Sequence, residues 1–158
     1  MRLYHGSSLS IPQPDVQYSR AHLDFGPGFY VTSFQEQAER WAQRKALRTG
    51  GSATVSIYEF HAPADLTTLS LQEDRAWLDF VCACRRGEGL SEPYGLVVGP
   101  VADDRVYDAI DLYYRGLWDV ETTLRAIRFY RLNDQYCFVT QRALESSLSF
   151  VESYEVKL

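Results

Sequence analysis

The stretch DFGPGFYVTSFQEQAERW, residues Asp24–Trp41, decides the fold of this chain. Its Gly26-Pro27-Gly28 segment predicts a turn that lets the backbone lie close to a neighbour, because glycine has no Cβ and proline fixes φ. The next three residues, Phe29-Tyr30-Val31, are aromatic and β-branched, which predicts a short buried strand. A glycine turn therefore leads directly into a strand.

The second half of the stretch predicts a helix. Ser33 and Glu36 have the spacing of a capping box, so the helix is expected to begin there and to run to about Arg48. Tyr30 on the strand and Trp41 on the helix then project near an approachable backbone, a geometry that suits a flat ring held between two rings. The same pattern is typical of packing aromatics at a strand–helix corner, and both interpretations stay open here. The expected inward face of the helix consists of Phe34, Ala38, Trp41 and Lys45.

Two further motifs flank this stretch. Leu3-Tyr4-His5-Gly6-Ser7 predicts an apolar strand that ends in histidine and glycine, and Asn133-Asp134-Gln135-Tyr136-Cys137-Phe138 predicts a turn that enters a strand. Together with the Gly-x-Gly-x-Tyr turn and strand, these segments resemble the ADP-ribosyltransferase superfamily in its branch with a His-Tyr-Glu triad. In that branch a further aromatic follows the tyrosine by eleven residues, as Trp41 follows Tyr30 here. The segments most resemble an uncharacterised bacterial family of that fold, domain of unknown function 3990.

The resemblance implies NAD+ as the substrate and gives roles to individual residues. The backbone N–H and C=O of Gly6 would clamp the nicotinamide carboxamide, with help from Ser7, and His5 would bond a hydroxyl of the adenosine ribose. Tyr30 and Trp41 would stack on the nicotinamide ring. The same resemblance places Gly28 in the approachable turn against the cofactor and Arg20 near the diphosphate, where a guanidinium fork is suited to phosphate oxygens. A solvated surface position is an equal interpretation for Arg20.

Gln135 occupies the position where the family has its catalytic glutamate. That glutamate bonds the 2′-hydroxyl of the nicotinamide ribose and opposes the growing positive charge on the sugar. Glutamine keeps the hydrogen bond, but it has no charge and cannot act as a general base. Asp134 is not expected to replace it, because alternation along a strand turns its side chain to the other face. Three outcomes follow: transfer to an acceptor that is already anionic, slow catalysis, or NAD+ binding without chemistry.

Composition limits the remaining possibilities. A chain of 158 residues predicts one domain, residues 1–158, and its net charge of −5 argues against a broad nucleic-acid footprint. The chain shows no apolar run of about 20 residues and no signal peptide, so a membrane span is not expected. Three cysteines are an odd number without secretory features, which predicts free thiols and a cytoplasmic protein. Cys82 and Cys84 lack a second metal-binding pair, so no metal is expected.

The other elements alternate irregularly along the chain, which predicts an α+β fold. By resemblance this is an ADP-ribosyltransferase-like, split, mainly antiparallel sheet that carries helices. Pro63 and the threonines after it are expected to form a loop. The expected elements are a central strand at Ala53–Phe60, a helix at Gln72–Arg86, a buried strand at Tyr94–Pro100, helices capped by Asp103 and Asp119, a short helix from Thr140 and a closing strand at Phe150–Val156.

The interpretation that unites these features is a bacterial mono-ADP-ribosyltransferase that modifies an unknown macromolecule. Members of the resembling family often appear beside small partner proteins, which suggests a toxin with an antitoxin-like partner. Two alternatives stay open: a catalytically silent module that binds NAD+, another nucleotide or a partner protein, and an NAD+ glycohydrolase that uses water as acceptor.

Overall fold

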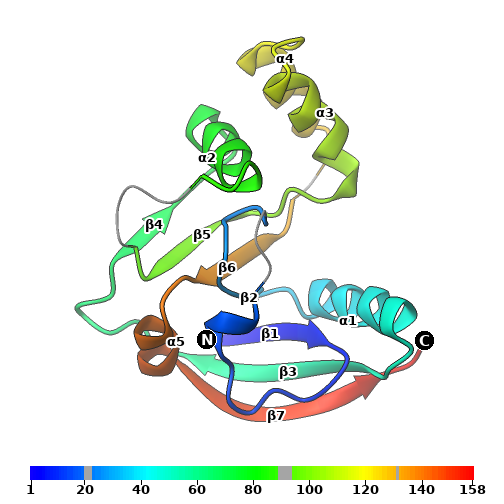
Figure 1. Cartoon of the computed structure of the whole chain (residues 1–158), viewed down its shortest axis with the longest axis vertical. Coiled ribbons are helices and arrows are strands. Elements are labelled where there is room, and N and C mark those ends of the chain that lie inside the picture. Colours follow the sequence, from blue (N-terminus) through cyan, green and yellow to red (C-terminus); the bar gives the residue numbers. More distant parts are fainter. Residues whose placement is uncertain (20–22, 89–93, 131) are drawn as a thin grey trace.

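The computed structural model describes residues 1–19, 23–88, 94–130 and 132–158. Within these residues the chain has an α+β fold, with seven strands in two sheets and five α-helices (Figure 1). All strand pairs are antiparallel except one, which confirms the predicted fold class.

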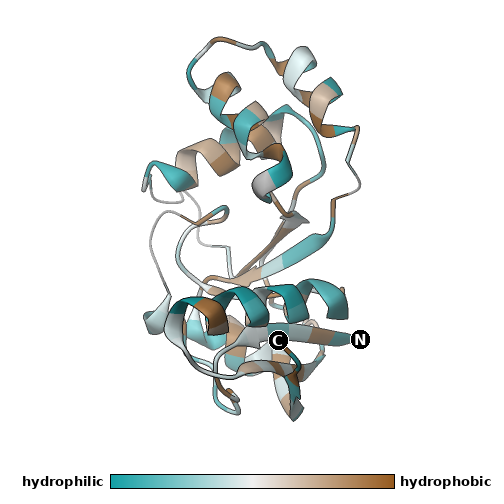
Figure 2. Cartoon of the chain, turned by 90° about the vertical axis from the view of Figure 1, so that its right-hand side faces the viewer, coloured by the Kyte–Doolittle hydropathy of each residue, from teal (hydrophilic) through white to brown (hydrophobic). Residues whose placement is uncertain are grey.

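The first sheet lies at the end of the molecule that carries both termini (Figure 1). Its three strands have the order β1 (Arg2–Ser7), β3 (Ala53–Phe60) and β7 (Leu148–Val156). Helix α1 (Gln35–Thr49) covers one face with the small side chains of Ala38, Ala42 and Ala46, all buried. Alanine allows a helix backbone to lie close to a strand, and the hydrophilic side of α1 is turned outward (Figure 2).

The second sheet has the order β2 (Phe29–Val31), β6 (Asp134–Phe138), β5 (Leu96–Pro100) and β4 (Thr68–Ser70). Strands β4 and β5 form the parallel pair. The two sheets meet where Tyr4 of β1 exchanges backbone hydrogen bonds of 2.8 and 2.9 Å with Thr32, the residue after β2. This bridge joins the edge of the first sheet to the edge of the second, although β1 and β2 belong to different sheets.

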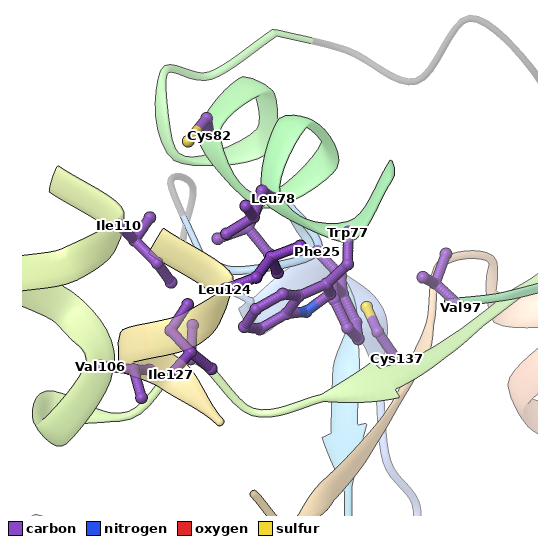
Figure 3. Close-up of a cluster of buried hydrophobic side chains, with 12 residues drawn as sticks. Phe25, Trp77, Leu78, Cys82, Val97, Val106, Ile110, Leu124, Ile127 and Cys137 are labelled. Carbon is purple, nitrogen blue, oxygen red and sulfur yellow. The ribbon is translucent and has the colours of Figure 1, made fainter. Parts of the chain in front are cut away.

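Three helices form a lobe at the far end of the second sheet (Figure 1). They are α2 (Arg75–Arg85), α3 (Asp104–Tyr114) and α4 (Val120–Ile127), and the side chains of Asp74, Asp103 and Asp119 cap their first turns. Trp77 lies at the centre of the lobe with no exposed surface, between α4 and the second sheet (Figure 3). Its indole nitrogen donates to the carbonyl of Pro100 at 3.1 Å, so the lobe is tied to β5.

The last helix, α5 (Gln141–Ser147), connects the two sheets. Thr140 caps it by accepting a hydrogen bond from the backbone N–H of Ala143 at 3.1 Å, as its position in the sequence predicts. The following residue, Leu148, begins β7, so the chain returns from β6 to the first sheet within a few residues. A short 3-10 helix at Val16–Tyr18 precedes β2.

Four local predictions are wrong. Ser33 does not cap α1: its N–H and hydroxyl both bond the carboxylate of Asp134, and Phe34 occupies the cap position without a side-chain bond. Phe34 is exposed, and Ala42 and Ala46 are buried in its place. Helix α2 begins at Arg75 rather than at Gln72, because Asp74 caps it. Finally, the expected loop after Pro63 contains strand β4 at Thr68–Ser70.

Candidate functional site

His5 lies at the junction of the two sheets. Its Nδ1 is 2.6 Å from the backbone carbonyl oxygen of Tyr30, and its ring stacks on Phe29 with centroids 4.4 Å apart. A carbonyl oxygen only accepts, so the contact assigns the proton to Nδ1 and leaves the lone pair on Nε2. Burial lowers the pKa of His5 to about 4, the Tyr30 carbonyl opposes this change, and the positive charge of Lys45 adds to it. The imidazole is therefore neutral near pH 7 and can accept a hydrogen bond.

The backbone of Gly6 points out of the first sheet. Tyr4 bonds Thr32 rather than β3, and alternate residues of a strand direct their N–H and C=O groups to the same side. The N–H and C=O of Gly6 therefore also face away from β3. A Cβ built on Gly6 would lie 2.0 Å from the carbonyl oxygen of Ala38 and 2.6 Å from the nitrogen of Ala42. Contact with α1 thus requires glycine at position 6, whether or not a ligand is bound.

Tyr30 braces the glycine turn from within. Its hydroxyl donates to the carbonyl of Gly26 at 2.5 Å and accepts from the N–H of Phe25 at 3.0 Å. Burial is the largest cause of the raised pKa of this phenol, so it stays protonated. Gly26 has φ of +77°, a conformation that glycine adopts readily. The Tyr30 hydroxyl is thus engaged by the protein itself, which leaves its ring as the part available for stacking.

Trp41 is partly buried on α1, one turn beyond Gln37. The described residues show no ring contact between Trp41 and Tyr30. The structure thus places the two aromatics on neighbouring elements, β2 and α1, without stacking them on each other.

Gly28 is used in packing between strands. A Cβ at this position would lie 2.4 Å from Sγ of Cys137 and 2.7 Å from the carbonyl oxygen of Phe138. Its N–H donates to the hydroxyl of Ser19 at 2.8 Å. The backbone of Gly28 therefore does lie close to a neighbour, and that neighbour is strand β6.

Ser7 and the three cysteines are buried, and Arg20 is not described. Ser7 is buried at the end of β1, opposite Thr54 of β3. Arg20 lies outside the described residues. Cys82, Cys84 and Cys137 are free and buried.

Gln135 belongs to a buried polar network. Its Nε2 donates to Oδ2 of Asp24 at 3.1 Å. Asp24 also forms an ion pair with Arg85 of α2, with an N–O distance of 2.6 Å, and accepts from the N–H of Ala102 at 3.0 Å. Asp134 bonds Thr32 and Ser33 instead, so the two side chains diverge as strand alternation predicts. The network joins the Asp24 turn, the helical lobe and β6.

A separate groove of about 960 Å³ opens between α1 and the start of α3. Gln37 lines this groove and is only 5% exposed. Its Oε1 accepts hydrogen bonds from Arg40 and from Asn133, both at 2.9 Å, and the second bond links α1 to the residue before β6. None of the residues predicted for the site lines this groove, although Asn133 is two residues from Gln135. The lining residues are Ser33, Phe34, Gln35, Glu36, Gln37, Glu39, Arg40, Arg44, Asp103, Arg105 and Asn133.

Sequence reasoning missed Asp24, Arg85 and Gln37. Arg85 lies 61 residues from Asp24, and only the packing of α2 against the turn brings them together. Asp24 had a local indication, since a carboxylate two residues before a glycine often hydrogen-bonds the backbone of the turn that follows it. Gln37 had none, because a glutamine within a helix is usually solvated.

The described residues contain no cluster of three or more His, Cys, Asp or Glu side chains that could hold a metal ion. None of the helices in this part of the chain combines the length and hydropathy that a transmembrane span requires. The family described as "Protein of unknown function (DUF3990)" matches residues 1–150. Neither a curated protein nor a solved structure gives a significant match.

Proposed function

The chain belongs to the DUF3990 family, and for this member we propose that it binds NAD+ and transfers ADP-ribose to a macromolecular acceptor. The observation that carries the proposal is the outward-facing backbone of Gly6 beside the neutral His5. The nicotinamide carboxamide has one carbonyl acceptor and an NH₂ donor, so it can pair with the N–H and C=O of one residue. Tyr30 and Trp41 offer rings from two adjacent elements, and stacked aromatics contribute about 0.5–1.5 kcal/mol beyond burial.

The reaction breaks the bond between C1′ of the ribose and the ring nitrogen of nicotinamide. The electron pair of that bond returns to the pyridinium nitrogen, so nicotinamide leaves as a neutral molecule. The acceptor oxygen then forms a bond to C1′, which has gained positive charge. Gln135 can accept a hydrogen bond from the ribose, but it cannot remove a proton from the acceptor. An acceptor that is already anionic, such as a carboxylate or a phosphate, needs no base.

The uncharged Gln135 also favours a second function, a module that binds NAD+ and leaves it intact. Removing the glutamate charge plausibly costs a few kcal/mol of transition-state stabilisation, as removal of one preorganised group does in other enzymes. An NAD+ glycohydrolase is the third reading, in which water takes the place of the acceptor. The proposal also includes action in the cytoplasm, which the three cysteines favour, and a role as a toxin paired with a small antitoxin-like protein, which rests on the family resemblance.

One experiment separates the three functions. The protein is incubated with bacterial lysate and NAD+ that carries the label in its ADP-ribose half. Labelled macromolecules support transfer, free labelled ADP-ribose supports hydrolysis, and intact NAD+ together with measurable binding supports the silent module. The Trp41→Ala variant should lose the signal, and Trp118→Ala, a change at another partly buried tryptophan on the helical lobe, should retain it. If wild-type protein neither binds nor cleaves NAD+, the proposal is wrong.

A further inference from the structure

The amide of Gln135 has partners at one end only. The side chain is 4% exposed, and its Nε2 lies 3.1 Å from Oδ2 of Asp24 and 3.5 Å from the carbonyl oxygen of Pro100. Both neighbours are acceptors, so the NH₂ end must face them. Within the described residues no donor reaches Oε1, and the Ser147 hydroxyl is the one buried side-chain polar atom that lacks a partner there. Oε1 of Gln135 is therefore open to solvent.

Asp24 is a rigid acceptor because its own carboxylate is saturated. Oδ1 accepts from Nε and Nη2 of Arg85 at 2.9 and 2.6 Å, and Oδ2 accepts from Ala102 and Gln135. Four bonds fill the lone-pair directions of a carboxylate. Arg85 is fixed in turn, since its Nη2 also donates to the carbonyl of Ala102 at 3.0 Å and its guanidinium lies over the ring of Tyr107. The carboxylate cannot rotate without breaking several of these bonds.

We propose that Asp24, held by Arg85, is a positioning residue that turns Oε1 of Gln135 toward the substrate as a fixed hydrogen-bond acceptor. This inference rests on the proposed function and names the group that would meet a ribose hydroxyl of NAD+. It also accounts for glutamine at position 135. An ionised glutamate there would present a second carboxylate to Asp24, whereas the amide presents a donor to Asp24 and a carbonyl to the substrate.

The charged groups near this pair determine what a carboxylate would do at position 135. Asp24 comes from the turn and Arg85 from α2. Cys84 of α2 and Tyr30 of β2 also interact with Asp24, and burial raises both of their pKa values, so they remain neutral near pH 7. Two carboxylates about 3 Å apart cannot both ionise freely, so a glutamate at 135 should have a pKa above its usual value of about 4.3.

The protonated form of that glutamate would reproduce the glutamine. Its O–H would donate to Asp24 as Nε2 does, and its carbonyl oxygen would face the substrate. Ionisation removes the hydrogen bond to Asp24 that orients the side chain, so the added charge is no longer held against the ribose. Activity of the Gln135→Glu variant should therefore approach the wild-type level at low pH and fall by up to tenfold per pH unit above the raised pKa. The wild-type protein has no such group, so its activity should stay flat over the same range.

The test measures kcat and KM for NAD+ cleavage between about pH 5 and pH 8, a range in which a raised carboxylate pKa is visible. Adding Asp24→Asn to Gln135→Glu leaves one carboxylate in the pair and should remove the pH dependence. Gln135→Met, which has similar length and no acceptor oxygen, should lower kcat by roughly ten- to a hundredfold at every pH, the range for one lost hydrogen bond to a charged centre, with KM nearly unchanged. Asp111→Asn, the same chemical change in the surface ion pair with Arg115, is the control and should change nothing.

The outcomes separate this inference from the proposed function. If wild-type protein neither binds nor cleaves NAD+, the proposed function fails and the inference falls with it. If wild-type protein cleaves NAD+ but the activity of Gln135→Glu is flat or rises with pH, only the positioning role of Asp24 is overturned. The same holds if Gln135→Met retains full kcat. Thermal unfolding of each variant shows whether it is folded, and Gln135→Met, which introduces no charge, keeps the test decisive if Gln135→Glu does not fold.

Discussion

Replacing Gly6 by alanine should destabilise the whole protein, because the added methyl group meets backbone atoms. An alanine Cβ at this position would lie 2.0 Å from the carbonyl oxygen of Ala38 and 2.6 Å from the nitrogen of Ala42. Both residues are fully buried within α1, so neither backbone atom can swing aside as the end of a long side chain can. Helix α1 must instead move away from β1 by about 1 Å or more to restore ordinary contact, which begins above about 3 Å.

The size of the effect follows from the packing that this movement would open. The contact between α1 and the first sheet buries three alanines of the helix together with Ala53 and Val55 of β3. Overpacking of a tight core typically costs about 1–3 kcal/mol and occasionally more. Because both obstructing atoms belong to the backbone, we expect Gly6→Ala to lie at the top of that range, about 3 kcal/mol. Shortening Ala38 to glycine should not rescue it, since the carbonyl oxygen of residue 38 remains in place.

Urea unfolding measures this directly as the change in the free energy of unfolding. Gly51→Ala is the matched control, because its Cβ would meet no atom closer than the Cβ of Ser8 at 3.3 Å. Its effect should therefore stay within about 0.5 kcal/mol. If Gly6→Ala unfolds with the wild-type free energy, α1 does not lie on β1 as described and the packing argument fails. If the variant is folded but destabilised, its NAD+ affinity then tests the carboxamide clamp separately.

Three further predictions concern other parts of the chain. Burial lowers the pKa of His5 to about 4 from an ordinary 6.5, so the unfolded chain binds a proton at this residue more readily than the folded chain does. The free energy of unfolding should therefore fall as pH drops from 6.5 toward 4, by at most about 3 kcal/mol because the ring is only partly withdrawn from water. Urea unfolding of His5→Gln at the same pH values should lack this part of the pH dependence. NAD+ should quench tryptophan fluorescence through Trp41, so Trp41→Ala should abolish the response and Trp118→Phe should keep it; quenching that survives Trp41→Ala would place the nicotinamide elsewhere. Burial raises the pKa of the Cys84 and Cys137 thiols to about 11 and 12, so iodoacetamide should label them slowly in the native protein and rapidly in urea by mass spectrometry, and rapid native labelling would contradict their burial.

Local chemistry made much of this fold predictable from the sequence. The strand at Phe29–Val31 was predicted with its observed bounds, and a strand was predicted within Asn133–Phe138, where the structure has Asp134–Phe138, because aromatic and β-branched runs beside turn residues are local patterns. The caps at Asp103 and Asp119 were predicted for the same reason: a capping side chain bonds an N–H two or three residues away.

The predictions that failed depend on partners far along the chain. Ser33 has the spacing of a capping box, but Asp134, 101 residues away, binds its N–H and hydroxyl in the folded protein. A carboxylate that only the tertiary structure brings near Ser33 thus takes the place of the expected capping interaction. Strand β4 has three residues, and among the described residues it pairs with β5 alone. Its pattern was therefore too short to predict. The network of Asp24, Arg85 and Gln135 was unpredictable for the same reason, because it spans three separate elements.

The glycines of the motifs and the polar groups of the site do not carry equal weight for function. Gly6 and Gly28 each have a packing reason in this fold, in contact with α1 and with β6, so a protein without catalytic activity would still need them. Nε2 of His5 and Oε1 of Gln135 serve no such purpose, since the described residues give neither a partner. The bond from Nε2 to Asp24 gives Gln135 a structural role, but that role leaves its Oε1 free to meet a ligand. Substitutions at His5 and Gln135 that keep the fold are therefore a more direct test of function in this chain than substitutions at its glycines.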